Sequence, residues 1–298
     1  MTVINSRRLR RGSPGEARVM PRELDALAFL AQAQPLTTNQ YAKLLGVSLP
    51  IAQRSLRKLV ALGLVRVHLT SLNAPNLYTL ARPACTLLAQ ELGRSPEEFP
   101  IVSGLGKINL PHHAGAVDLY IALRRATTAS RSVRLEAFLL EHEIRLQLGG
   151  AKGTLVPDAA AQLVDHDGAQ LGVAFEIDLA TENATWVAER KGIPYGTLWS
   201  TEKPLLGCSS WLVCCVVPSE RRRNRLVTAL WDAGVPEGLW HFAVADTVTE
   251  HRILTATWWT PRLAPGNERA RLVPENPLQP GRTGWYSGNS RQDGTKLR

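Results

Sequence analysis

The sequence predicts an α/β protein, α+β over the whole chain, with a mostly helical N-terminal domain and a second domain around a mixed central sheet. Three observations support this prediction. Residues 21–92 show apolar positions at helical spacing, together with one short hairpin pattern. Residues 112–262 alternate between helix and strand patterns. Residues 93–111, which lie between these segments, carry the Pro and Gly residues that are typical of a linker.

The two ends of the chain have the composition of flexible segments. Residues 1–20 mix Arg with Ser, Gly and Pro, which predicts a disordered basic arm. Residues 263–298 are rich in Gly, Pro, Asn and Arg and predict a flexible tail. Apolar residues make up 44% of the 298 residues, which excludes a wholly disordered chain. No apolar run approaches the roughly 20 residues of a membrane span. We therefore expect no membrane partner, and a reducing cytoplasm is the default location for four cysteines without a disulfide-dense pattern.

The net charge of +9 is distributed unevenly along the chain. Residues 1–70 hold 11 Lys and Arg against 3 Asp and Glu, and no acidic residue occurs between Asp25 and Glu91. Residues 71–218 carry a net charge of −3, and residues 219–298 carry +4. The basic first segment favours a polyanion as partner. The acidic middle segment holds candidate ligands for a cation.

A helix–turn–helix pattern follows the first predicted helix. Thr37 or Thr38 is expected to cap a short second helix, which stops at Gly46. Ser48 is expected to cap the next helix, which ends at Gly63. The apolar positions of that helix form one stripe, so its remaining faces are predicted to be exposed.

The helix after Ser48 is followed by two short alternating runs, residues 64–69 and 76–80, which predict a β-wing. The whole pattern resembles the winged helix–turn–helix superfamily. Basic and amide side chains on such a helix and wing reach phosphates and base edges of duplex DNA. An alternative is a protein-interaction adaptor, because many winged helices bind proteins, but the acid-free charge block favours DNA. The predicted DNA-contacting residues are Ser48, Gln53, Arg54, Arg57, Lys58 and Arg66.

Three carboxylates are predicted to share one face of a hairpin in the second domain. Two extended runs, residues 154–164 and 171–179, flank a turn that contains Gly168. A three-residue loop with Gly168 in the left-handed region places Asp158 opposite Glu176, with Asp178 on the same face. A two-residue loop would scatter these acids. The other face of the three-residue register is entirely apolar, so this register is favoured.

Carboxylates at such spacing repel one another when they are ionised. Mg²⁺ or Mn²⁺ relieves this repulsion, because hard cations prefer oxygen ligands. The sequence therefore predicts a metal site at Asp158, Glu176 and Asp178. A metal held there would activate water and stabilise a phosphoryl transition state.

The elements around the hairpin follow a defined order. Residues 114–126 and 134–146 are helix candidates before it, and Trp211–Val217 reads as a buried strand after it. Residues 219–233 then predict a helix, and residues 239–245 predict another strand. Strand pair, helix, strand, helix, strand is the order of the restriction-endonuclease-like core.

Several short sequence motifs in this domain resemble those of the replication-relaxation family of bacterial plasmid and mobile-element proteins. They are Pro157-Asp158, then Glu-Ile-Asp and Thr-Glu within residues 176–182, and Lys191 and Tyr195 downstream. The resemblance covers about residues 21–245. It implies a winged helix ahead of a PD-(D/E)xK-like domain, and a role in replication or mobilisation of mobile DNA. It also implies double-stranded DNA and other replication or mobilisation proteins as partners, and some relatives act as relaxases that nick DNA.

The resemblance also implies site residues. The carried-over catalytic residues are Asp158, Glu176, Asp178, Lys191 and Glu143. His112 or His113 matches the histidine of the family, and the choice between them is open. Glu-Ile-Asp stands where nucleases have Glu-x-Lys, so Lys191 would have to supply the cation. Tyr195 is a candidate nucleophile of the relaxase type, but a buried tyrosine at a helix end is the favoured reading.

The expected function is therefore that of a DNA-binding protein of plasmid or mobile-element replication or mobilisation, with metal-dependent nicking by a relaxase or nuclease site. The alternative is a non-enzymatic regulator or replication initiator with a degenerate nuclease fold. A solvent-facing Lys191 would favour the alternative, and a Lys191 that reaches the acids would favour cleavage.

Overall fold

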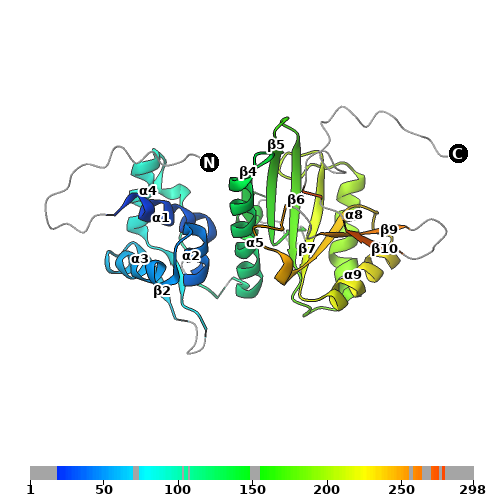
Figure 1. Cartoon of the computed structure of the whole chain (residues 1–298), viewed down its shortest axis with the longest axis horizontal. Helices are drawn as coiled ribbons and strands as arrows, with labels where there is room; N and C mark the ends of the chain where they lie inside the picture. The colour runs from blue at the N-terminus through cyan, green and yellow to red at the C-terminus, as the bar shows by residue number, and fades with distance from the viewer. Residues whose placement is uncertain are drawn as a thin grey trace. The chain divides into compact units, whose positions relative to one another are not determined.

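The computed structural model in Figure 1 describes residues 19–69, 74–102, 104–106, 108–147, 155–254, 258–263, 270–274 and 277–278. Almost all of the predicted basic arm and most of the predicted tail lie outside these residues. The chain divides into two units, Met1–Leu110 and Pro111–Arg298. Within the described ranges, none of the helices combines the length and the apolar character that a membrane span needs.

The first unit is a winged helix–turn–helix, as predicted. Its three short strands form an antiparallel sheet in the order β1-β3-β2. The elements are α1 Pro21–Ala33, β1 Leu36–Thr37, α2 Thr38–Leu45, α3 Leu49–Ala61, β2 Val65–His68, β3 Leu77–Leu80, α4 Arg82–Leu92 and the 3₁₀ turn η2 Pro96–Glu98.

Local chemistry accounts for the helix–turn–helix. Thr37 is the cap of α2, because its Oγ1 accepts a hydrogen bond from the Gln40 backbone N–H at 3.2 Å. Gly46 ends α2 with a φ of 62°, which a side chain would strain. A buried hydrogen bond of 2.9 Å between Tyr41 Oη and Ser55 Oγ then joins α2 to α3. This hydrogen bond between two buried hydroxyl groups helps to fix the orientation of α2 relative to α3.

The segment predicted as a linker, residues 93–111, is only in part a connection. Phe99 is buried, and the Gln34 Nε2 donates to the Pro100 carbonyl at 2.6 Å. The same Gln34 accepts from the Leu80 N–H at 2.8 Å, so one amide ties this segment to the wing. The next helix begins at Leu110.

The second unit is an α/β domain around a seven-stranded mixed sheet in the order β10-β9-β8-β7-β6-β5-β4. The pairs β6–β7 and β7–β8 are parallel, and the other pairs are antiparallel. The elements up to the middle of the sheet are α5 Leu110–Ala129, β4 Val133–Leu140, α6 Glu141–Gln147, β5 Ala159–Asp165 and β6 Gln170–Ile177. After them come α7 Ala184–Val187, the π-helical turn η3 Ala188–Gly192, α8 Ile193–Ser200, β7 Trp211–Val217, α9 Glu220–Asp232, β8 Trp240–Val244, the 3₁₀ turn η4 Ala245–Thr247, β9 Trp259–Leu263 and β10 Ala270–Pro274.

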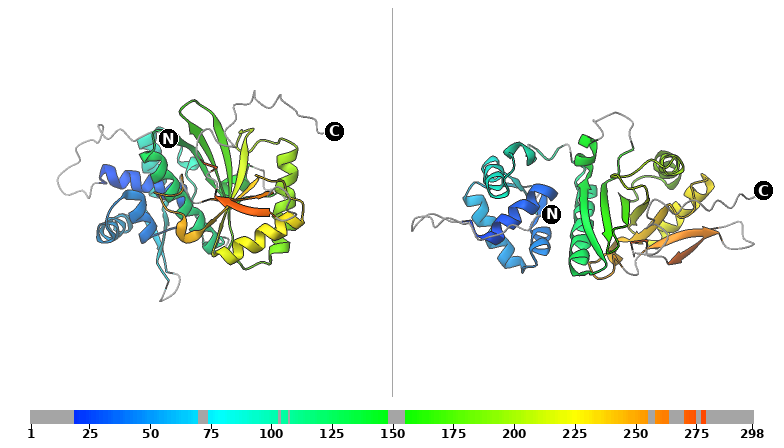
Figure 2. Two further views of the ribbon diagram at one scale, coloured as in Figure 1. Left: turned by 45° about the vertical axis from the view of Figure 1, so that its right-hand side comes forward. Right: turned by 90° about the horizontal axis from the view of Figure 1, so that it is seen from above.

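Helices cover both faces of this sheet. Figure 2 shows α5 along one face and α8 and α9 along the other. On the α5 face, the rings of Phe138 and Phe175 lie 6.2 Å apart. On the opposite face, Val187, Leu230 and Trp240 belong to one buried apolar cluster. This arrangement buries both sides of β6 and explains why its residues are almost all apolar.

The predicted hairpin register is confirmed. Ala159 pairs with Phe175, and the pairing continues to Val164 and Gln170. The Asp165 N–H donates to the Ala169 carbonyl at 3.0 Å, and Gly168 has a φ of 85°. The loop therefore has three residues, and the two-residue alternative is excluded.

Two expectations for the second domain were wrong. Residues 134–146, predicted as one helix, form all but the first residue of strand β4 and then most of the short helix α6. The spacing of their apolar residues is compatible with a helix and with a strand. Residues 134–140 form a strand because β4 pairs with β5. The predicted tail contains strand β10, which pairs with β9 and so satisfies backbone groups at that edge of the sheet.

Candidate functional site

Asp158 precedes β5 and is held by two hydrogen bonds. Its Oδ2 accepts from the Ile177 backbone N–H at 2.7 Å, and its Oδ1 lies 3.2 Å from His112 Nδ1 in the first turn of α5. The helix can approach because Gly115 has no side chain: a Cβ there would lie 2.8 Å from Ile177. Of the two candidate histidines, His112 is therefore the one with a described contact to Asp158.

Glu176 lies on β6 and is 2% exposed. Its Oε1 accepts a hydrogen bond from the Tyr195 hydroxyl at 2.6 Å, and its Oε2 forms an ion pair with Lys191 Nζ. Lys191 and Tyr195 are four residues apart on the continuous helical segment η3–α8, so both face the strand. Between them, Gly192 is in such close contact with Leu230 of α9 that any side chain would overlap it.

The charges of this cluster are coupled. Burial raises the pKa of Glu176 to about 7, although Lys191 counteracts this effect. Burial would lower the pKa of Lys191, but the carboxylates of Glu176 and Asp158 outweigh burial and raise it. Burial likewise opposes ionisation of Asp158, yet His112, Lys191 and the Ile177 N–H hold its pKa below the usual value. The hydrogen bond to Asp158 raises the pKa of His112. Lys191 therefore interacts electrostatically with both acids.

Asp178 follows the end of β6 and has a different partner. Its two carboxylate oxygens accept from Arg222 Nε and Nη2 of α9, each at 2.7 Å, and both side chains are 9% exposed. Asp178 still lines the same pocket as Glu176, together with His112, Glu182 and Lys191. The sequence did not predict that Arg222, which lies within the Arg-rich start of α9, pairs with Asp178.

Among the described residues, no hydrogen bond or ion pair joins Glu143 to Asp158, Glu176 or Lys191. The Glu143 Oε2 accepts from the Leu140 backbone N–H at 2.9 Å, so it caps the start of its own short helix. Burial raises the pKa of this carboxyl group. The expected role of Glu143 as the helix acid of the site therefore has no geometric support, because its carboxylate is used locally.

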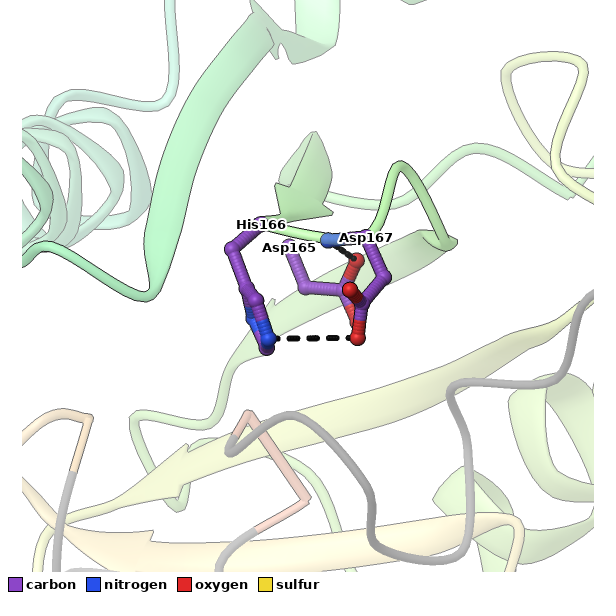
Figure 3. Close-up of side chains that lie close together, drawn as sticks. All are labelled: Asp165, His166 and Asp167. Atoms are coloured by element: carbon purple, nitrogen blue, oxygen red, sulfur yellow. Dashed lines mark hydrogen bonds and ion pairs between the residues drawn. The ribbon is translucent and has the colours of Figure 1, made fainter.

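A second acidic group lies in the β5–β6 turn. Figure 3 shows Asp165, His166 and Asp167, whose candidate ligand atoms lie within 4.8 Å of one another. The Asp165 Oδ1 accepts from the N–H groups of Asp167 and Ala169 at 2.9 and 2.8 Å, which is turn chemistry. His166 Nε2 is 3.1 Å from Asp167 Oδ2, and both side chains are exposed. This group is at the opposite end of β5 from Asp158 and is separate from the candidate site.

The predicted DNA-contacting residues of the winged helix fall into two groups. Most are exposed on α3, on the residue before it, or on the wing: Ser48, Gln53, Arg54, Arg57 and Arg66. Ser48 occupies the N-cap position of α3, but its side chain makes no capping hydrogen bond. Lys58 differs, because its Nζ lies 2.8 Å from the buried Glu23 of α1. Its charge is therefore partly used within the protein.

Comparison with known proteins identifies one family. The family model described as replication-relaxation matches residues 27–204, a range that includes His112, Asp158, Glu176 and Tyr195. No curated protein matches the chain. A crystal structure of a zinc-responsive MarR family member from Lactococcus lactis, ZitR, matches at 22% identity and a TM-score of 0.23, over 30% of this chain and 62% of that chain.

Proposed function

The chain belongs to the replication-relaxation family and so has a DNA-related role in replication or mobilisation, and we propose that it binds duplex DNA through α3 and nicks a strand at the Glu176 pocket. The observation that supports cleavage is the convergence of Lys191 on Glu176, with Asp158 beside them. Two acids and one lysine are the side chains that a nuclease site of the PD-(D/E)xK type uses.

The donor set fits a divalent cation. Mg²⁺ is commonly bound by one or two carboxylates, with waters and substrate phosphates completing its shell. Each carboxylate oxygen of Asp158 and Glu176 accepts a hydrogen bond within the protein, but every such oxygen has a second lone pair. Hydrogen bonds of this kind orient ligating carboxylates. A bound Mg²⁺ or Mn²⁺ would stabilise phosphoryl charge and lower the pKa of a coordinated water.

The remaining side chains have distinct roles in this proposal. Lys191 is held beside the acids as a cation, in position to stabilise the negative charge that develops on the phosphate. His112 has its Nδ1 on Asp158, which leaves Nε2 as the nitrogen to exchange a proton with the substrate or its water. Tyr195 is 2% exposed and donates to Glu176. It therefore positions Glu176, and the structure gives it no access as a nucleophile.

A nicking assay tests this proposal. Supercoiled plasmid that carries the DNA flanking the gene is incubated with the protein and Mg²⁺ or Mn²⁺. The fraction of open-circular plasmid is then measured by gel electrophoresis. Asp158→Ala and Glu176→Ala should each lower the rate by about 100-fold or more, because each removes a proposed metal ligand. Asp167→Ala, in the exposed turn, is the matched control and should nick normally. Nicking that persists in both site variants would refute the assignment.

One observation favours a second candidate function, a non-enzymatic regulator or initiator. All four carboxylate oxygens of Asp158 and Glu176 have partners within the protein, as they would in a purely structural cluster. This candidate predicts a gel shift with steep salt dependence and no nicking with any divalent metal.

The two groups of α3 residues should respond differently to mutation. Arg54→Ala should weaken duplex binding at all sequences and lower the salt slope by about 1, if Arg54 contacts one phosphate. Lys58→Ala should change the affinity less, because Lys58 is paired with Glu23. Fluorescence anisotropy over a range of salt concentrations measures both quantities. An equal loss in the two variants would show that the Lys58–Glu23 pair does not keep Lys58 from the DNA.

A further inference from the structure

A tryptophan is exposed next to a residue that lines the pocket. Trp186 of α7 is 38% exposed, and the following residue, Val187, lines the pocket. The Asn183 Oδ1 accepts from the Trp186 backbone N–H at 2.6 Å and caps this short helix. Val187 is buried in the apolar cluster between α9 and the sheet. Trp186 is therefore an exposed residue on a short helix that is anchored beside the pocket.

Positive charge lies on the helix that packs against α7. Helix α7 packs against α9, and Arg222 in the first turn of α9 reaches Asp178 in the pocket. Arg221 and Arg225 are exposed and four residues apart, so they share one face of α9. A cation in the first turn of a helix opposes the helix dipole, so Arg221 does not stabilise the start of α9. The exposed placement of Arg221 and Arg225 suits an anion from outside the chain.

An exposed indole beside arginines suits single-stranded DNA better than a duplex. An indole offers a flat surface on which any base can stack, but the base faces of a duplex are already stacked on each other. Arginines beside an aromatic side chain provide for the backbone phosphates of the same strand. A protein partner would need a continuous apolar patch, whereas the flanking surface of α9 is cationic.

We propose that Trp186 stacks on an unpaired base of a DNA strand, with Arg221 and Arg225 on the neighbouring phosphates, so that the adjoining phosphodiester enters the pocket. The inference rests on the proposed nicking function, because it names the form of DNA that the pocket receives. Strand binding, however, does not require cleavage and can be measured without it.

The test uses the full chain in EDTA with single-stranded oligonucleotides that carry 2-aminopurine at successive positions. Stacking on Trp186 should quench the fluorescence of 2-aminopurine at a defined position. Trp186→Leu should abolish the quenching and weaken single-strand binding by about 5- to 100-fold, whereas Trp186→Phe should retain most of both. Ile193→Ala is the matched control, since Ile193 is a 45% exposed apolar residue on the adjoining helix. Duplex binding through α3 should be unchanged in all variants.

The outcomes separate this inference from the proposed function. Unchanged quenching and affinity in Trp186→Leu would overturn the stacking role, whatever the nicking assay shows. Equal losses for single strand and duplex would overturn it as well, because the effect would not depend on an unpaired base. Position-specific quenching that disappears in Trp186→Leu supports it, even if no metal produces nicking.

Discussion

Arg222→Ala is expected to destabilise the second unit by about 3–5 kcal/mol, the cost of leaving a buried charge without its partner. Asp178 and Arg222 are each 9% exposed, and two hydrogen bonds of 2.7 Å join them. Without the guanidinium, the Asp178 carboxylate loses its hydrogen-bonding partner in a poorly solvated place. Urea unfolding, followed by tryptophan fluorescence, measures the loss.

The neighbouring residues provide the controls for this prediction. Arg221→Ala changes an exposed arginine in the same turn and should stay within about 0.5 kcal/mol of the wild type. The double variant Asp178→Ala/Arg222→Ala should be more stable than Arg222→Ala alone, because it leaves no unpaired charge. If Arg222→Ala and Arg221→Ala are equally stable, the ion pair contributes nothing measurable to the fold.

Lys191→Met is expected to lower the nicking rate by about 100- to 1,000-fold, the usual effect of removing one group that stabilises transition-state charge. Burial already raises the pKa of Glu176 to about 7, and without Lys191 that pKa should rise further. A protonated Glu176 is a poor metal ligand but a tolerable buried group, so the fold should be kept. The rate in the plasmid assay and the melting temperature together test this expectation.

Arg190→Met is the matched control for Lys191→Met, because Arg190 is the adjacent residue of η3 and is exposed. It should nick at the wild-type rate, and both variants should bind duplex DNA normally through α3. A Lys191→Met protein that nicks as fast as the wild type would show that the lysine is only a structural partner of Glu176.

Local chemistry made much of the structure predictable. The winged helix followed from apolar spacing, a threonine cap and the glycine at residue 46, all of which act within a few residues. The hairpin register followed from Gly168 and from the two-residue period of the strands, since a shift of one residue would have exposed the apolar face. The same argument predicts Asp158 opposite Glu176, and Asp158, which directly precedes β5, accepts a hydrogen bond from the N–H of Ile177, the residue after Glu176.

Other features were not predictable, because they depend on residues that are distant in sequence. Residues 134–140 have a pattern that suits a helix as well as a strand, and only the edge of β5 made them a strand. Glu143 was predicted to join the site, but its carboxylate accepts a hydrogen bond from the Leu140 N–H at the start of its own helix. Asp178 was paired by Arg222, which is 44 residues away. No local rule specifies that Glu176 pairs with Lys191 and Asp178 with Arg222.

The sequence by itself therefore determined the two-domain organisation, the winged helix and the hairpin register, since periodicity and turn chemistry act over short distances. The tertiary structure decided what Asp158, Glu176 and Asp178 do. The packing of α5, η3–α8 and α9 against β6 brought His112 to Asp158, Lys191 and Tyr195 to Glu176, and Arg222 to Asp178. The pairing of buried charges depends on three-dimensional proximity and on the loss of solvent, and both arise only when the helices close over the sheet.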